Sequence, residues 1–302
     1  MTQMAQHTLE EGSISDADFS RIAGLVREMM GIDLQPHKRT MVASRLSKRL
    51  RATGYDTVDS YIDYMLSPQG QDEQTRFVSA YTTNMTRFNR EGHHFEQLAN
   101  DILPDLMNQA RKGKRVRIWS AGCSSGEEPY GLAFNVLDAC PEAGDLDVKI
   151  LATDIDTEIL ATAKRGVYPA SSTGSLPNGQ GDKYFMPVDG SGERRSVNDK
   201  VRDLISFRRL NLHGEWPFKG KFDIIMCRNV AIYFDAPTQS RLWQRFGEQL
   251  CQNGLLFIGH SEGIGPEHAE LFTMVGRGVF STDTSRIGNS TSNATLHMGN
   301  IQ

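Results

Sequence analysis

The chain has 302 residues, a formal net charge of −4 and 38% hydrophobic residues, enough apolar material for one large core or two modest ones. No run approaches the roughly 18 apolar residues of a membrane span, and the first residues do not resemble a signal peptide. We therefore expect a cytoplasmic, two-domain protein. The widely spaced cysteines predict neither a disulfide framework nor a zinc site; they are Cys123, Cys140, Cys227 and Cys251.

The first part of the chain has the apolar spacing of helices. Large apolar residues recur every three to four positions in 15–32, 59–66 and 93–110, and Ser15 with Asp18 forms a capping-box-like pair. This pattern predicts a small helical domain over residues 15–85, followed by an interdomain segment over 86–114. The polar ends, residues 1–14 and 283–302, are expected to be disordered.

Residues 36–54, inside this helical part, contain six lysines and arginines and no acid. Drawn as a helix, Val42, Leu46 and Leu50 share a face that can pack inward. A positive flank lies beside that face, formed by Lys38, Arg45, Lys48 and Arg49. We expect a negatively charged partner to dock there, the alternative being a solvated helix face; the net charge of −4 disfavours nucleic acid.

After Lys114 the pattern changes to β-rich stretches separated by helical ones. The expected strands are 116–121, 147–155, 204–212, 222–229 and 254–260, with helical patterns at 128–139, 156–166 and 236–252. This alternation predicts an α/β fold with a doubly wound, Rossmann-like and mainly parallel sheet. Residues 270–283 predict an antiparallel hairpin at the sheet edge. The Gly-, Pro- and Ser-rich stretch 168–198 predicts an insertion of loops and short strands rather than a helix.

The stretch "WSAGCSSGEEPY", residues 119–130, stands where the first expected strand becomes a helix. Gly122 and Gly126 let the backbone turn sharply, while Glu127 and Glu128 fall in the first turn of the helix. The spacing is neither GxGxxG nor a P-loop, and the carboxylates have the wrong charge for a phosphate. A cationic ligand without phosphate, such as S-adenosylmethionine, fits better; a glycine turn needed only for packing is the alternative.

Polar residues also follow the other strands, at the edge where open α/β sheets bind ligands. Asp154 ends the second strand and can accept hydrogen bonds from ribose hydroxyls, whereas Asp156 is placed to cap the next helix. Asn229 and Asn211 follow later strands in the same way, and Tyr233 can shape the pocket or belong to the core.

Two further motifs suggest other chemistries. "GHSEG", residues 259–263, matches the GxSxG nucleophile elbow, with His268 downstream. No well-formed helix follows it at once and no acid has the expected place in the chain order, so a hydrolase is disfavoured. His93 and His94 are adjacent, which points them to different faces, and no carboxylate partner is evident, so no metal site is expected.

Six segments in this order and spacing closely resemble the CheR-type chemotaxis receptor glutamate methyltransferases, over roughly residues 15–280. They are "TNMTRFNRE", "WSAGCSSGEEPY", "ATDIDTEILATAKRGVYP", "RLNL", "FDIIMCRNVAIYFD" and "IGHSE". The resemblance implies an S-adenosylmethionine-dependent methyltransferase domain over 115–282, with a small antiparallel β subdomain inserted at about 170–200. One departure is Asn89, where the family usually has a second aromatic residue before the arginine.

By motif match, the resemblance implies cofactor contacts at Asn84, Thr86, Arg90, Glu128, Asp154, Asn211, Leu212, Asn229 and Val230. The expected reaction is attack of a receptor glutamate carboxylate on the sulfonium methyl, giving a glutamyl methyl ester and S-adenosylhomocysteine. Arg90 is expected to orient that carboxylate, with Tyr233 as a second candidate. The expected partner is the cytoplasmic helical methylation region of transmembrane chemoreceptors, with a receptor C-terminal peptide as a candidate ligand of the insertion. We expect a monomer without a metal.

Three alternatives share parts of this pattern. A methyltransferase for another target would keep the cofactor site, although the [DN]PPY-like motif of amino-group methylation is missing from the sequence. A sensory module could bind S-adenosylmethionine without turnover. A nucleotide-binding oxidoreductase is disfavoured by the glycine spacing.

Overall fold

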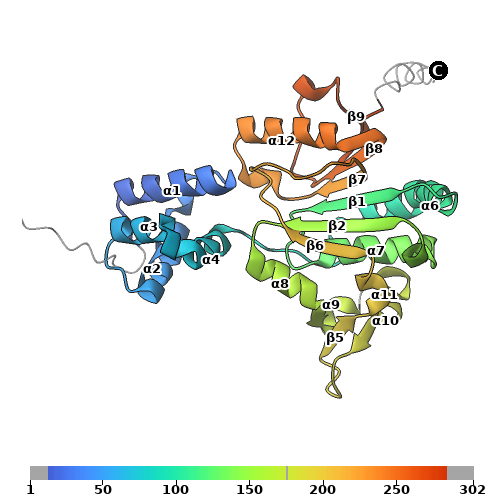
Figure 1. Cartoon of the computed structure of the whole chain (residues 1–302), viewed down its shortest axis with the longest axis horizontal. Helices are drawn as coiled ribbons and strands as arrows, with labels where there is room; N and C mark the ends of the chain where they lie inside the picture. Colours follow the sequence, from blue (N-terminus) through green and yellow to red (C-terminus); the bar gives the residue numbers. More distant parts are fainter. Residues whose placement is uncertain (1–12, 175, 284–302) are drawn as a thin grey trace, which may run out of the picture.

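The computed structural model describes residues 13–174 and 176–283. The chain forms a helical domain, a larger sheet domain and a small inserted subdomain that hangs below the sheet in the view of Figure 1. The two ends expected to be disordered lie outside the described residues except at their inner margins, where Ile14 is buried in the helical core. Among the described helices, none is long and apolar enough to cross a membrane.

Four helices build the N-terminal domain around one apolar core, and they confirm the predicted helical pattern. They are α1 (Asp16–Met30), α2 (Arg39–Thr53), α3 (Val58–Leu66) and α4 (Gln71–Tyr81). The predicted cap is present, since the Ser15 side chain accepts a hydrogen bond from the Asp18 N–H at 3.0 Å. Gly31 ends α1 in the left-handed conformation with φ 76°, which glycine adopts without steric cost.

An irregular segment over residues 82–92 leads from α4 to the sheet domain. The predicted helix 93–110 follows as α5 (His93–Gln97), a π-helical turn (Leu98–Ile102) and α6 (Leu103–Arg111). The irregular segment therefore runs between the two domains, and the residues of its motif "TNMTRFNRE" can reach a site that both domains share.

The central sheet has seven strands in the order β6-β2-β1-β7-β8-β10-β9. The parallel strands are β1 (Val116–Ala121), β2 (Val148–Asp154), β6 (Ile205–Arg209), β7 (Phe222–Cys227) and β8 (Leu250–Ile258). The edge hairpin of β9 (Thr273–Gly276) and β10 (Val279–Ser281) pairs antiparallel with β8 through β10. This arrangement confirms the predicted doubly wound sheet with an antiparallel edge.

Alternating side chains bury both faces of the sheet. Ile118, on one face, belongs to the core with α6 and α7 (Glu127–Ala139), while Trp119 on the other belongs to the core with α12 (Ala236–Gln249). The strand order reverses at β1, because β2 lies on one side of it and β7 on the other. A ligand crevice is expected at the carboxyl ends of the strands at such a switch point.

The inserted subdomain is a three-stranded antiparallel sheet in the order β3-β5-β4, formed by β3 (Val167–Pro169), β4 (Phe185–Pro187) and β5 (Arg194–Val197). The expectation of strands is confirmed, but two one-turn helices, α9 (Ala170–Thr173) and α10 (Gln180–Lys183), were not predicted. The Asp138 carboxylate of α7 anchors the insertion by accepting hydrogen bonds from Gln180, Lys183 and Tyr184.

Candidate cofactor cleft and active site

A cleft opens at the carboxyl ends of β1, β2, β6 and β7, between the sheet and the helical domain. It holds about 970 Å³ of space including its open mouth. Met30 and Ile32 at the end of α1 close one side. Every residue expected to contact the cofactor or the reacting groups lines it, namely Asn84, Thr86, Arg90, Glu128, Asp154, Asn211, Leu212, Asn229, Val230 and Tyr233.

The turn after β1 requires glycine at two positions, because of both the backbone conformation and the close packing there. Gly122 and Gly126 have φ values of 83° and 101°. A Cβ at Gly122 would lie 2.5 Å from Cγ2 of Val230, and one at Gly126 would lie 2.8 Å from the Tyr168 hydroxyl oxygen. No side chain fits there without a shift, so the turn lets the wall of the cleft approach a ligand closely.

Asp156 caps the next helix as predicted, and Asp154 lies in the cleft. Asp154 is 8% exposed, lines the cleft and accepts hydrogen bonds from the backbone N–H groups of Ser124 at 2.8 Å and Asp156 at 3.0 Å. Burial raises the pKa of Asp154 to about 6, against the lowering effect of these N–H donors. Asp156 instead caps α8 (Thr157–Arg165).

The Asp156 carboxylate also fastens the end of α4 and the irregular segment 82–92 to the sheet domain. It accepts hydrogen bonds from the side chains of Ser79 at 2.5 Å, Thr82 at 2.9 Å and Asn84 at 2.8 Å. The Asn84 carbonyl in turn accepts from the Ser124 hydroxyl at 2.9 Å. Asn84 is thereby held at the cleft wall by Asp156, which follows β2, and by Ser124 in the glycine turn.

Glu128 brings a second carboxylate to the cleft, from the first turn of α7. It accepts a hydrogen bond from the Ser120 hydroxyl at 2.7 Å and lies 3.3 Å from Nη1 of Arg228. Burial raises the pKa of Glu128, while the charge of Arg228 opposes that rise. Two carboxylates therefore border the place beside the α7 N-terminus where a nucleotide phosphate would otherwise lie.

The two predicted asparagines are fixed in different ways. The Asn211 side chain joins the domains, donating to the Met29 carbonyl at 2.7 Å and accepting from the His213 N–H at 3.0 Å. Asn229 has a left-handed backbone with φ 59°, and its side-chain N–H donates to Glu91 at 3.3 Å. Its Oδ1 is buried and has no hydrogen-bond partner within the described chain, which leaves an open acceptor on a cleft residue.

Arg90 and Tyr233 bring an ionic and an aromatic side chain to the same cleft. Nη1 of Arg90 donates to the Met85 carbonyl at 2.9 Å. Asn89 is exposed and has φ 54°, a conformation that asparagine tolerates better than an aromatic residue. The buried aromatic of this motif is Phe88, which packs edge-on to Tyr168 with ring centroids 4.8 Å apart. Asparagine in place of an aromatic residue at the exposed position 89 therefore leaves the core packing of Phe88 in place.

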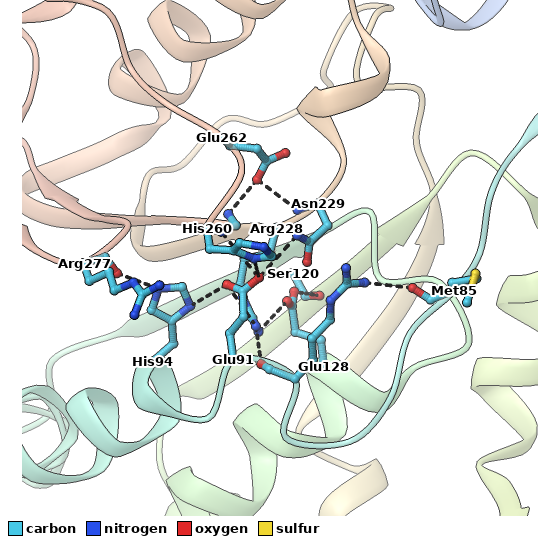
Figure 2. Close-up of polar contacts among 12 residues, drawn as sticks. Met85, Glu91, His94, Ser120, Glu128, Arg228, Asn229, His260, Glu262 and Arg277 are labelled. Atoms are coloured by element: carbon cyan, nitrogen blue, oxygen red, sulfur yellow. Dashed lines mark hydrogen bonds and ion pairs between the residues drawn. The ribbon is translucent and has the colours of Figure 1, made fainter. Parts of the chain in front are cut away.

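Residues behind the cleft that sequence reasoning passed over form a polar cluster, shown in Figure 2. Glu262 accepts hydrogen bonds from the backbone N–H groups of Asn229, Val230, Ala231, Ile232 and Gly259. This contact explains the "GHSEG" motif as a clamp on the loop after β7. The structure disfavours the hydrolase alternative further, because Nε2 of His268 contacts the Ser240 hydroxyl at 3.0 Å rather than the serine of this motif.

The prediction that His93 and His94 point apart without a carboxylate partner is wrong. Their rings lie 4.2 Å apart, and ligand atoms of both lie within 4.8 Å of a Glu91 carboxylate oxygen, because the turn before α5 folds back. The guanidinium of Arg228 is 3.6 Å from Glu91, however, so a positive charge already faces this carboxylate and opposes a metal ion. Burial, followed by the charge of Arg228, lowers the pKa of His94 to about 4.

The predicted basic flank on α2 needs a correction. Arg49 points into the domain and donates to the Glu73 carboxylate at 2.8 and 2.6 Å, and Glu73 is 2% exposed. Arg45 is half-buried and donates to the Thr82 carbonyl at 3.3 Å. The buried Glu73 carboxylate and the Thr82 carbonyl hold these two arginines, which leaves Lys38 and Lys48 as the exposed members of the four.

The residues of the cleft fit S-adenosylmethionine, which carries a sulfonium and an ammonium group but no phosphate. Glu128 and Asp154 offer carboxylates, Asn229 offers a buried open acceptor, and Gly122 leaves room for a close approach. The sheet order with its antiparallel β10 and this acidic cleft together define a class I, S-adenosylmethionine-dependent methyltransferase.

Comparison with known proteins gives the family. The model of the CheR methyltransferase S-adenosylmethionine-binding domain matches residues 84–280, and that of the CheR methyltransferase all-alpha domain matches residues 17–82. The chain therefore belongs to the CheR methyltransferase family. The predicted family and cofactor are confirmed.

Two curated relatives and one solved structure illustrate the similarity. A probable chemotaxis protein methyltransferase of Rhizobium etli is 46% identical over 259 residues, covering 85% of this chain and 97% of that protein. A chemotaxis protein methyltransferase of Escherichia coli is 38% identical over 283 residues, covering 93% and 96%. A magnesium protoporphyrin IX methyltransferase from Synechocystis PCC 6803, solved with bound S-adenosylmethionine, aligns over 72% of this chain and 92% of that chain, with a TM-score of 0.36 and 14% identity.

Proposed function

We propose that the protein transfers methyl groups from S-adenosylmethionine to glutamate side chains of chemotaxis receptors and acts in the cytoplasm as a monomer. The observation that carries this proposal is the placement of Arg90 in the same cleft as Asp154 and Glu128, where an acidic substrate group can be oriented beside the cofactor. The chemotaxis methyltransferases of Rhizobium etli and Escherichia coli support the choice of pathway.

The residues proposed to hold the cofactor come from four strand ends and the interdomain segment. Asp154 would accept hydrogen bonds from the ribose hydroxyls, and Glu128 would face a positive group. Asn229 would use its open Oδ1 as an acceptor. The remaining contacts would come from Asn84, Thr86, Arg90, Asn211, Leu212 and Val230.

When bound, S-adenosylmethionine supplies a methyl group on a sulfonium, and a glutamate carboxylate oxygen that displaces the sulfur yields a glutamyl methyl ester and S-adenosylhomocysteine. A glutamate has an ordinary pKa of about 4.3, so the attacking carboxylate is already ionised at neutral pH and needs no strong base. The protein's contribution is then to orient this group and to exclude water. Arg90 is assigned the orienting role and Tyr233 the adjoining wall; a tight ion pair would weaken the nucleophile, so Arg90 acts through geometry.

The proposed substrate segment is the helical, glutamate-bearing methylation region of a receptor. Lys38 and Lys48 are exposed, and they would steer this acidic segment by long-range attraction that salt weakens. The inserted subdomain is the proposed place for a receptor C-terminal peptide, because its edge strand β4 and the residue that follows carry the exposed side chains of Met186 and Val188.

Incubation of the protein with radiolabelled S-adenosylmethionine and receptor-rich membranes tests the proposal. A base-labile label on receptor protein is expected, because a methyl ester hydrolyses in alkali whereas a methylated amine does not. A base-stable label on protein or nucleic acid would establish a methyltransferase with another target. Cofactor binding without any transfer would favour the sensory module.

A further inference from the structure

Arg90 lies between two residues with unusual backbone conformations. Asn89 and Glu91 both have φ 54°, in the left-handed region. Asparagine adopts this region readily, but glutamate does so only where surrounding contacts hold it there. The position of Arg90 therefore depends on whatever fixes Glu91.

The contacts of Glu91 join three segments of the chain, as Figure 2 shows. Its Oε1 accepts hydrogen bonds from Nδ1 of His260 at 2.8 Å and from Nδ2 of Asn229 at 3.3 Å, and its Oε2 lies 3.6 Å from Nη2 of Arg228. The side chain is 10% exposed and lies outside the set of residues that line the cleft. Burial alone would raise the pKa of Glu91, but the His260 hydrogen bond and the Arg228 charge outweigh it and lower the pKa to about 2.

Arg228 connects Glu91 to the backbone of Arg90. Its side chain is 2% exposed and stands between the carboxylates of Glu91 and Glu128. Its Nη2 donates a hydrogen bond to the backbone carbonyl of Arg90. A chain of charge-assisted contacts thus runs from Glu91 through Arg228 to the backbone of Arg90.

We propose that Glu91 is a positioning residue for methyl transfer, which holds the loop of Arg90 in place through Arg228 and His260 without touching cofactor or substrate. Glu262 has the complementary task, because its hydrogen bonds fix the loop of Asn229 and Val230, which line the cleft as proposed cofactor contacts. The inference rests on the proposed function. The two glutamates are assigned different steps. Glu91 supports methyl transfer, and Glu262 supports binding of the cofactor.

Glu91→Gln and Glu262→Gln, made in the full chain, test this division. The turnover number is measured with receptor-rich membranes, and the Kd of S-adenosylmethionine is measured by calorimetry. Glu91→Gln keeps an oxygen that can accept from Nδ2 of Asn229, so it should lower kcat at least about tenfold and raise Kd by no more than about threefold. Glu262→Gln weakens the acceptor for the N–H groups of Asn229 and Val230 and should raise Kd at least about fivefold. Glu142→Gln is the matched control, because Glu142 also pairs with an arginine, Arg111, at the surface, and it should match the native protein.

A double variant separates positioning from a general structural role. If Glu91 acts through Arg90, Glu91→Gln should lower kcat by less than about twofold in an Arg90→Lys background. Should Glu91→Gln fail to fold, His260→Asn takes its place, since this 54%-exposed side chain can be removed from the surface; it should lower kcat about threefold at unchanged Kd. Native kcat in the folded single variant, parallel changes in Kd and kcat, or additive losses with Arg90→Lys would overturn the inference. Absence of transfer by the native protein would instead contradict the proposed function.

Discussion

Glu73 in the helical domain and Asp154 in the cleft are both almost fully buried, at 2% and 8% exposure, yet their partners differ. Glu73 receives two hydrogen bonds from Arg49 and one from the Tyr61 hydroxyl at 2.8 Å. Asp154 receives backbone N–H donors and faces the cleft. The carboxylate with an arginine partner serves the fold, whereas the one without such a partner keeps acceptor capacity for a ligand.

The two carboxylates also differ in how burial affects the stability of their charged forms. Hydrogen bonding to Glu73 raises the pKa of Arg49, which marks a pair that is charged and mutually satisfied. Asp154 has its pKa raised to about 6 by burial, so the folded protein disfavours its charge. Its contribution to the free energy of unfolding is fully present below its ordinary value of 3.8 and is lost as the pH rises through about 6. An ionised Asp154 therefore costs stability at neutral pH and provides a ligand site.

The largest effect is expected from breaking the pair in the helical domain. Arg49→Met leaves the buried Glu73 carboxylate without its cation and should lower the free energy of unfolding by about 3 to 5 kcal/mol. Urea unfolding measures it, and Lys48→Met at the exposed neighbouring position should stay within about 0.5 kcal/mol of the native value. Equal stability of the two variants would mean that Arg49 is as dispensable as a surface cation.

The next effect concerns catalysis in the cleft. Arg90→Ala should lower methyl transfer at least about 100-fold, or about 2.7 kcal/mol, with an unchanged melting temperature, because Arg90 orients the attacking carboxylate. Lysine should not restore the rate, since a point charge lacks the planar fork of a guanidinium. Activity within about twofold of native would reduce Arg90 to a structural role and direct attention to Tyr233.

A smaller effect should follow pH. If ribose hydroxyls donate to an ionised Asp154, acid must weaken cofactor binding as the pH falls through about 6. The Kd of S-adenosylmethionine should rise about tenfold from pH 7 to pH 5, and Asp154→Asn should remove most of this dependence. Glu128, the other cleft carboxylate with a raised pKa, accounts for the part that remains. An equally steep dependence in the Asp154→Asn variant would assign the titration elsewhere.

The smallest effect is expected at the exposed lysines. Reversal of Lys38 and Lys48 to glutamate should lower receptor methylation about threefold at low salt and have no effect at high salt, because steering by surface charge is screened. Cofactor affinity should not change. A loss that persists at high salt would indicate direct contacts rather than steering.

The residues that sequence reasoning located correctly are those whose place follows from topology. Asp154 ends a parallel strand, and Asn211 and Asn229 come after two others; parallel strands bring such positions to one edge of a sheet. The glycines at 122 and 126 carried a second signal, because few other residues tolerate their backbone conformation.

The residues whose surroundings the sequence did not predict depend on contacts between distant segments. Helical spacing set Arg49 beside the apolar face of α2 but could not show that Glu73, on α4, would draw it inward. His93 and His94 are adjacent in sequence, and a backbone turn rather than their spacing brings them to Glu91. Glu262 stood in a recognised motif, yet its role as an acceptor for a row of N–H groups needed the loop after β7 to be in view.

Calorimetric titration of S-adenosylmethionine into the native protein and into Asp154→Ala tests whether the cleft binds the cofactor. We expect binding to the native chain and an affinity about 5- to 150-fold weaker in the variant, from the loss of about 1 to 3 kcal/mol of hydrogen bonding. Unchanged affinity in Asp154→Ala, or no binding to the native chain, would contradict the assignment of the cleft.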